Sequence, residues 1–206
     1  MTARLHPRVL DTLPPGVRRP AYDRRALRTG IVHLGLGAFA RAHLAAVNDD
    51  ALEAGAPLQW GLHGVSLRHA DVRDALLPQQ GLYSLGLRDA AGVRTRIIGS
   101  VVSNAVAPED PQAVVNAIAH ADTRIASLTV TEKGYCHDPA TRALNFAHAD
   151  IAHDLVDAAA PRSAIGLLVR GLQARRDHGA QPLTLLSLDN LPANGDTLRG
   201  LVLGFA

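Results

Sequence analysis

Short apolar runs alternate with longer segments of helical periodicity along most of the chain. Such runs, when glycine or polar residues bound them, are typical of strands buried in a parallel sheet. Strands are predicted at residues 31–34, 60–67, 125–130 and 183–188. Helices are predicted at residues 41–54, 71–77, 111–121, 163–178 and 196–205, with a weaker one at 151–159. Because strands separated by helices favour parallel pairing, the pattern predicts an α/β fold with a doubly wound parallel sheet.

Two segments depart from this alternation. Residues 83–87 and 93–98 flank Asp-Ala-Ala-Gly at 89–92, which is a hairpin signal, so a small hairpin insertion is predicted. Residues 1–28 contain several prolines and no periodic apolar pattern, and they are predicted to form an irregular lead-in. Residues 29–206 are predicted as one domain. Its last helix stops inside an apolar run without a polar closing turn, so we expect the domain to be truncated there.

Composition narrows the possible classes of protein. Hydrophobic residues make up 47% of the 206, which is enough for a sizeable core. No run approaches the roughly 18 apolar residues of a membrane span, and the first residues lack the apolar segment of a secretory leader. The 21 basic side chains nearly balance the 19 acidic ones, which argues against nucleic acid as a partner. The single cysteine, Cys136, excludes an internal disulfide and fits a reducing cytoplasm, where we expect the protein.

A glycine turn follows the first strand. Residues 31–43 read Ile-Val-His-Leu-Gly-Leu-Gly-Ala-Phe-Ala-Arg-Ala-His, and the Gly-x-Gly-x-x-Ala spacing within them fits the dinucleotide-binding fingerprint. The first glycine permits the tight turn, the second lets a diphosphate approach the backbone, and the alanine lets the helix lie close to the strand. The helix N-terminus then presents unpaired N–H groups to the phosphates. We therefore expect a cofactor to contact Leu34, Gly35, Leu36, Gly37, Ala38, Phe39 and Arg41.

The motif by itself leaves alternatives open. Glycine turns between a strand and a helix also occur in methyltransferases, which bind S-adenosylmethionine. His43, at the end of the motif, is expected to orient the turn rather than to transfer protons. The spacing of the ten histidines is not that of metal ligands, so no metal site is predicted.

Two further strand ends carry polar residues. Thr131 and Glu132 follow the strand at 125–130, and Asp189-Asn190 follows the strand at 183–188. In open parallel sheets, ligands collect at the carboxyl ends of strands, near the switch in strand order. We therefore expect Thr131 and Glu132 to contact the same cofactor as the glycine turn.

The end of the second strand bears on the choice of cofactor. NAD-binding folds often place an acidic residue there to bind the ribose hydroxyls. Here Arg68 is positioned to meet a 2′-phosphate, which would suit NADP, whereas Asp71 is within reach of a ribose. Arg68 is a predicted cofactor contact, and the residues alone leave both NAD and NADP possible.

Several motifs resemble the mannitol dehydrogenase family of long-chain polyol and hexuronate dehydrogenases. Gly-x-Gly-x-Phe-x-Arg-Ala-His at 35–43 is similar to the opening signature of that family. Asp-Asn-x-x-x-Asn-Gly at 189–195 resembles a further family segment. Similarity to the fructuronate reductase branch is found in Thr-Val-Thr-Glu-Lys-Gly-Tyr at 129–135, Pro-Arg-Ser-Ala-Ile-Gly at 161–166 and Ile-Ile-Gly-Ser at 97–100.

The resemblance implies the N-terminal domain of an NAD-dependent oxidoreductase. Hydride would pass between nicotinamide and a polyol or hexuronate, as in the mannitol–fructose or mannonate–fructuronate pair. The resemblance assigns Asn190 to polarise the substrate carbonyl, because an amide N–H stabilises developing charge without titrating. From the residues alone, an Asx turn at Asn190 is the alternative.

The resemblance also implies what these residues lack. The family carries its general base on a helical C-terminal domain, and no matching motif occurs here. We therefore expect this fragment to bind cofactor and to be inactive alone. A non-catalytic dinucleotide-binding module is the competing interpretation.

Overall fold

The computed structural model describes residues 4–206, and its main sheet has five parallel strands. These strands are β1 (Thr29–Leu34), β2 (Gly61–Ser66), β5 (Val101–Val106), β6 (Ile125–Leu128) and β7 (Thr184–Ser187). Their order across the sheet is β5-β2-β1-β6-β7. The chain builds one half outward from β1 and then returns to the centre to build the other half, which is the strand order of a Rossmann fold. The predicted doubly wound parallel sheet is confirmed.

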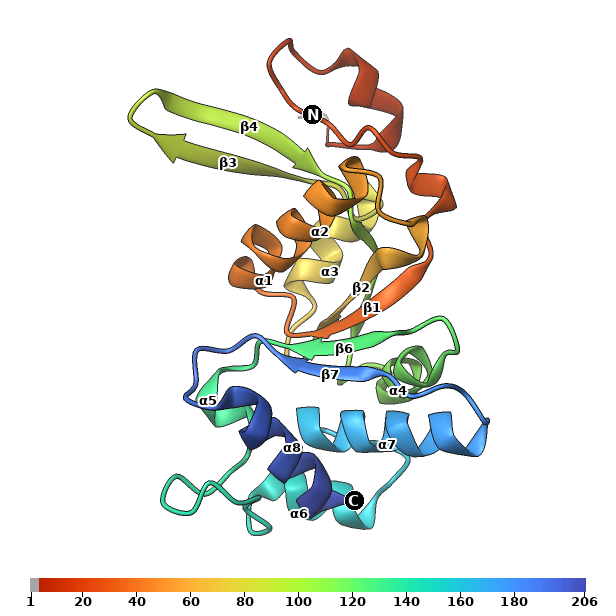
Figure 1. Cartoon of the computed structure of the whole chain (residues 1–206), viewed down its shortest axis with the longest axis vertical. Helices are drawn as coiled ribbons and strands as arrows, with labels where there is room; N and C mark the ends of the chain where they lie inside the picture. Colours follow the sequence, from red (N-terminus) through yellow and green to blue (C-terminus); the bar gives the residue numbers. More distant parts are fainter. Residues whose placement is uncertain (1–3) are drawn as a thin grey trace.

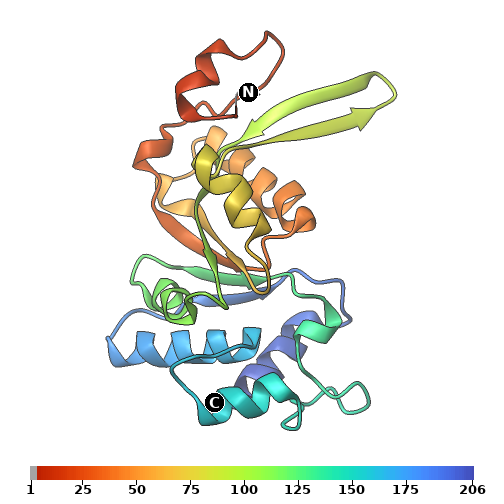
Figure 2. The same cartoon turned by 180° about the vertical axis from the view of Figure 1, so that it is seen from behind.

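Helices cover both faces of the sheet (Figure 1). On one face lie α1 (Ala38–Ala42), α2 (Leu44–Glu53) and α3 (Asp71–Leu76). On the other side lie α4 (Pro111–Ala119), α6 (Ala149–Val156), α7 (Ala164–Asp177) and α8 (Asn194–Phe205). The view from behind shows the same two layers (Figure 2).

Each face of the sheet has its own apolar core. The central strand β1 contributes to both, with Val32 and Leu34 in one cluster and Ile31 in the other. This division follows from the geometry of a strand, whose successive side chains point to opposite faces. Within residues 4–206, no helix combines the length and the apolarity that crossing a bilayer requires.

An antiparallel hairpin projects from this body (Figure 1). It consists of β3 (Tyr83–Asp89) and β4 (Gly92–Ile98), which confirms the predicted insertion. Residues 4–28 run past the base of the hairpin and include the 3₁₀ helices η1 (Pro7–Thr12) and η2 (Arg24–Ala26). The first three residues of the predicted lead-in lie outside the described residues. Two further 3₁₀ turns are η3 (Leu58–Trp60) and η4 (Leu77–Gln79).

The structure differs from the predicted elements in three places. The sequence pattern misses β5, because Ser103 and Asn104 interrupt its apolar run. The helix predicted at 41–54 begins instead at Ala38, and the backbone of His43 (φ −114°, ψ −77°) divides it into α1 and α2. The strand predicted at 125–130 ends at Leu128, and the segment after it forms a short helix, α5 (Thr131–Gly134), for which no element was predicted.

Candidate functional site

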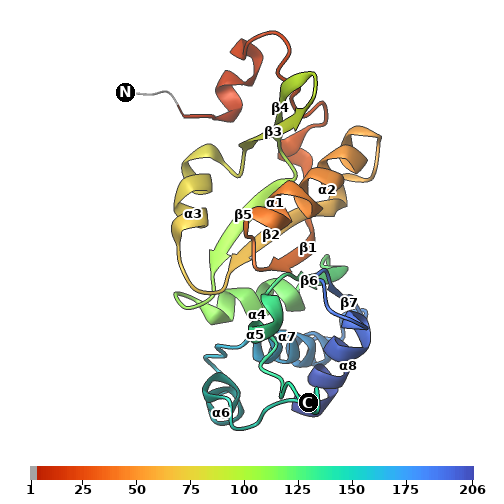
Figure 3. The same ribbon diagram turned by 90° about the vertical axis from the view of Figure 1, so that its left-hand side faces the viewer.

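The carboxyl ends of the parallel strands gather at one edge of the sheet, which faces the viewer in Figure 3. The strand order reverses there between β1 and β6, and open parallel sheets bind ligands at such a position. A cleft of about 400 Å³ lies at this edge, between the turn after β1, the end of β2 and the segment after β6. Five of the predicted site residues line it, namely Gly35, Leu36, Gly37, Arg68 and Thr131.

Gly35 makes the tight turn that the motif predicts. Its φ is +96°, a backbone conformation that L side chains rarely adopt. A Cβ at this position would lie only 2.1 Å from the carbonyl oxygen of Thr129. The Gly35 N–H donates to the carbonyl of Val65 at 2.8 Å. The packing of the chain itself therefore requires glycine at this position.

Gly37 is not required by the fold in the same way. Its φ of −76° suits any residue, and a Cβ there would meet no atom of the chain closer than the Gly35 carbonyl oxygen at 3.8 Å. Gly37 precedes α1, whose first N–H groups have no intrahelical partner. The side chain that is missing at Gly37 thus leaves open space beside unpaired amides, which fits the approach of a diphosphate.

A buried histidine on β1, His33, is hydrogen-bonded to residues beside this turn. The side chain of His33 on β1 is fully buried between the hydroxyls of Ser127 and Thr129, both from β6 or its end. His33 Nδ1 lies 2.9 Å from Ser127 Oγ, and His33 Nε2 lies 3.0 Å from Thr129 Oγ1. The predicted orienting residue, His43, is exposed and its ring lies against Phe39, with 4.4 Å between the ring centroids. His33, rather than His43, is therefore the histidine that is hydrogen-bonded beside this turn.

The lowered pKa of His33 makes the free energy of unfolding depend on pH. Burial lowers the pKa of His33 from 6.5 to about 4. Between these two values the unfolded chain binds more protons than the folded one, so the folded state loses stability as the pH falls. We expect His33 to account for a loss of up to about 3 kcal/mol between pH 7 and pH 4. Urea unfolding at several pH values measures it.

The control for this effect is an exposed histidine. A His33→Gln variant should lose less stability over this pH range than the wild type, whereas His69→Gln at the exposed His69 should follow the wild type. Equal pH slopes for wild type and His33→Gln would contradict the assignment.

Asp189 fixes the segment after β6. Its carboxylate accepts the N–H of Val130 at 3.0 Å, the N–H of Thr131 at 3.1 Å and the hydroxyl of Tyr135 at 2.8 Å. Burial raises the pKa of Tyr135, which keeps its proton for this bond. The single hydroxyl proton of Tyr135 goes to the carboxylate, so Ser187 donates to Tyr135 across 2.6 Å.

The backbone of Thr131 is unusual. Its φ is +63°, which is an outlier for a β-branched residue. Such conformations persist only where neighbouring structure imposes them, and here the two N–H bonds to Asp189 do so. The sequence placed Thr131 at a strand end but gave no sign that Asp189 holds it.

Asn190, the predicted catalytic residue, is exposed at the end of β7. Among residues 4–206 its side chain has no hydrogen-bond partner, so the Asx turn is not formed. The hydrogen bonds that hold the Asp-Asn-x-x-x-Asn-Gly segment in place come from Asp189 and Asn194. Asn194 donates to the carbonyls of Ser187 at 3.2 Å and Asp189 at 2.9 Å, which folds the segment over the strand end.

The remaining predicted contacts lie around the cleft rather than in its lining. Leu34 is fully buried, whereas Ala38, Phe39 and Glu132 are exposed. Arg41 folds back over the turn, and its Nη1 donates to the carbonyl of Leu36 at 2.9 Å. Arg41 therefore acts on the conformation of the turn from the helix side.

A cluster of three potential metal ligands lies away from the cleft. Ligand atoms of Cys136, His148 and Asp150 lie within 4.8 Å of one another. His148 Nδ1 accepts the N–H of Asp150 as the cap of α6, and burial raises the pKa of Cys136 to about 11, so the thiol stays protonated. These contacts explain the group as a helix cap beside a buried thiol.

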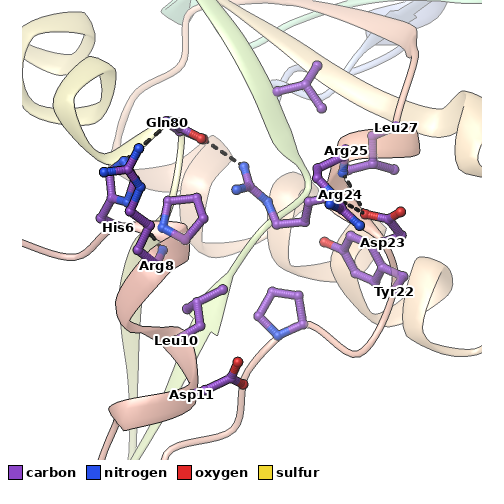
Figure 4. A pocket seen from close by; sticks show the side chains of 13 residues that line it. His6, Arg8, Leu10, Asp11, Tyr22, Asp23, Arg24, Arg25, Leu27 and Gln80 are labelled. Carbon is purple, nitrogen blue, oxygen red and sulfur yellow. Dashed lines mark hydrogen bonds and ion pairs between the residues drawn. The ribbon is translucent and has the colours of Figure 1, made fainter.

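A larger hollow of about 700 Å³ lies under the lead-in and shares no residue with the cleft (Figure 4). Within residues 4–206, most of its charged groups are already engaged, with Arg8 as the exception. Arg24 donates to the carbonyls of Gly99, Gln80 and Val101, and Arg25 pairs with Asp23. The strand-end cleft is therefore the better candidate for a binding site.

The sequence model of the mannitol dehydrogenase Rossmann domain matches residues 29–206. The chain belongs to the mannitol dehydrogenase family. Mannitol 2-dehydrogenase of Pyricularia oryzae is 40% identical over 92% of the chain, and that of Cereibacter sphaeroides is 42% identical over 92%. An uncharacterized oxidoreductase of Escherichia coli, YeiQ, is 42% identical over 95%. The chain spans only 39–40% of the length of these relatives.

Solved structures agree with the family assignment. The ternary complex of Pseudomonas fluorescens mannitol 2-dehydrogenase with NAD and D-mannitol has a TM-score of 0.93 and is 37% identical. It is covered over 42% of its length, and the match takes in 98% of this chain. A D-sorbitol dehydrogenase in substrate-free form has a TM-score of 0.90 and is 33% identical. The resemblance found in the sequence motifs is confirmed, and with it the Rossmann fold.

Proposed function

We propose that this domain binds NAD at the carboxyl edge of its sheet and takes part in hydride transfer to or from a polyol or a hexuronate. The observation that carries the proposal is the glycine turn, where the fold requires Gly35 but not Gly37. A family whose members include mannitol 2-dehydrogenases makes a dinucleotide the natural occupant of the space at Gly37.

The residues present fit this cofactor. The amides at the start of α1 would receive the diphosphate, because a helix N-terminus carries unpaired N–H groups and partial positive charge. Thr131 would lie beside the cofactor where its segment lines the cleft. When bound, NAD supplies or accepts the hydride at its nicotinamide. The chain contributes binding and orientation.

Asn190 is proposed to hold the reacting oxygen. Its amide lies at the end of β7, exposed and free of partners within residues 4–206. Asn194 holds the carbonyl of Asp189, the residue before Asn190, and Asp189 is bonded in turn to the segment after β6. An N–H donor at this position would stabilise the negative charge that develops on the substrate oxygen as hydride arrives.

Cofactor choice can be tested at the end of β2. Arg68 and Asp71 both line the cleft, so a cationic and an anionic side chain compete for the same ribose. NAD is proposed as the cofactor, with Arg68 giving NADP partial access. Arg68→Glu should weaken NADP binding about 10-fold relative to NAD, because the 2′-phosphate would lose a cation and face an added carboxylate.

Calorimetric titration of both cofactors into the wild type and Arg68→Glu measures this ratio. Arg142→Glu, at an exposed arginine that does not line the cleft, is the matched control and should leave the ratio unchanged. An NAD/NADP affinity ratio that Arg68→Glu does not shift would show that Arg68 does not read the ribose.

Turnover separates the enzymatic role from a binding module. The chain spans about two fifths of the length of its relatives. We propose that it binds NADH, and that its turnover number is at least about 10²–10⁴-fold lower than that of a full-length enzyme of the family, which is the usual contribution of a general acid–base. The test adds fructose or fructuronate to the NADH-loaded protein and follows nicotinamide absorbance. Rapid substrate-dependent oxidation would contradict the proposed dependence on further residues. Absence of NADH binding would contradict the proposed function itself.

A further inference from the structure

His33, Thr129 and the carbonyl of Gly35 form a continuous hydrogen-bonded chain below the glycine turn. His33 Nε2 lies 3.0 Å from Thr129 Oγ1, and the Thr129 hydroxyl donates to the Gly35 carbonyl at 2.9 Å. At its other end, His33 Nδ1 lies 2.9 Å from Ser127 Oγ. β1 and β6 are paired with His33 opposite Ser127, so these side chains share one face of the sheet.

The direction of each bond follows from counting protons. Thr129 has one hydroxyl proton, and the Gly35 carbonyl can only accept, so that proton lies between them. His33 must then donate from Nε2 to Thr129, which leaves Nδ1 as an acceptor for the Ser127 hydroxyl. A neutral imidazole in this single tautomer satisfies every group in the chain.

The end of this chain sets the orientation of a peptide group in the turn. The Gly35 carbonyl and the Leu36 N–H belong to one peptide plane, and the Leu36 N–H donates to Val65 at 3.2 Å. The same carbonyl accepts the N–H of Gly37 at 2.6 Å. Holding the Gly35 carbonyl therefore fixes the start of the turn, while Arg41 holds the next carbonyl, that of Leu36.

We propose that His33 is a positioning residue for the cofactor, which acts through Thr129 to hold the Gly35 carbonyl and so to aim the amides at the start of α1 at a diphosphate. This inference rests on the proposed function, since it concerns the same site. It predicts that ligands with a diphosphate depend on the chain of hydrogen bonds, whereas ligands without one do not.

Thr129→Val is the direct test, because valine keeps the shape of threonine and removes both hydrogen bonds. The dissociation constants of NADH and ADP should rise about 10-fold, because the change in binding free energy is then about that of one hydrogen bond. Adenosine, which has no phosphate, should bind as it does to the wild type. Thr129→Ser keeps the hydroxyl and should restore the affinity for NADH to within about 3-fold.

The matched control is Thr123→Val. Thr123 is a buried threonine at the opposite end of β6, where its hydroxyl donates to the Ala117 carbonyl at 2.7 Å. This variant should lower the melting temperature as Thr129→Val does, without changing the affinity for NADH. Equal NADH affinities for Thr129→Val and Thr123→Val would overturn the inference.

Two further variants test the route of the effect. His33→Leu should weaken NADH binding, but adding it to Thr129→Val should weaken binding no further, because residues that act in series are not additive. Ser127→Ala is a milder change, which frees the imidazole to take its other tautomer, and it should weaken NADH binding about 3-fold. Additive losses in the double variant, or full affinity in Ser127→Ala, would overturn the inference. Wild-type protein that binds neither NADH nor ADP would instead overturn the proposed function.

Discussion

Gly37→Val should abolish measurable NADH binding and leave the fold intact. The backbone at Gly37 (φ −76°) accepts any residue, and the nearest atom to a Cβ there is the Gly35 carbonyl oxygen at 3.8 Å. The added side chain would instead fill the space that the diphosphate needs. We expect the dissociation constant to rise at least about 100-fold, which corresponds to roughly 2.7 kcal/mol, with the melting temperature unchanged. Calorimetric titration and thermal unfolding measure the two quantities.

Two glycines serve as controls for this variant. Gly200→Val, at an exposed position of α8 with open space around it, should change neither quantity. Gly35→Ala should lower the melting temperature itself, because its Cβ would lie 2.1 Å from the Thr129 carbonyl oxygen at a φ of +96°. If Gly37→Val bound NADH as the wild type does, the diphosphate could not lie at this turn.

Among the variants proposed here, Asp49→Ala should lower the free energy of unfolding most. The Asp49 side chain on α2 is fully buried and accepts three hydrogen bonds, from Arg96 at 2.6 Å, Tyr22 at 2.5 Å and the Gly99 N–H at 2.8 Å. These partners come from the hairpin, from the lead-in and from the loop after β4. Removing the carboxylate leaves Asp50 as the remaining carboxylate partner of the buried Arg96 and takes the acceptor away from the Tyr22 hydroxyl and the Gly99 N–H. Losses of this kind in a buried network typically cost about 3–5 kcal/mol. The melting temperature should fall by roughly 6–20 °C.

Thermal unfolding of Asp49→Ala and of Glu109→Gln gives the comparison. Glu109 pairs with Arg73 at the surface, where solvent weakens the attraction, so Glu109→Gln should leave the melting temperature unchanged. A similar melting temperature for both variants would show that Asp49 does not tie the lead-in and the hairpin to α2. Proteolysis should also cut residues 4–28 sooner in Asp49→Ala, because Tyr22 would lose its acceptor.

Local patterns in the sequence were sufficient for most of the fold. The spacing of Gly35, Gly37 and Ala40 predicts strand, turn and helix because each position has its own steric requirement, and the structure has all three elements. β5 could not be predicted in this way. Its Ser103 and Asn104 are tolerated because it is an edge strand, and edge position is set by the whole sheet rather than by the local sequence.

The candidate site was only partly predictable for a related reason. A motif names the residues that are close in the chain, so His43 was expected to orient the turn. The residues that are hydrogen-bonded beside it, His33 and Thr129, lie 96 positions apart and meet through strand pairing. One signal was available in the sequence, since a histidine inside one buried run and two hydroxyl residues at alternate positions of another are unusual. The role of Asp189 in holding residues 130 and 131 was not predicted, because the family resemblance assigns a function to its neighbour Asn190.

The most direct test of the central claim is to map which backbone amides respond to the cofactor. NADH titrated into isotope-labelled protein should give its largest amide chemical-shift changes at Leu36, Gly37, Ala38 and Phe39, with smaller ones at Thr131. That result would place the diphosphate on the glycine turn. Changes confined to the hollow around Tyr22 and Arg24, or no changes at all in folded protein, would contradict the account.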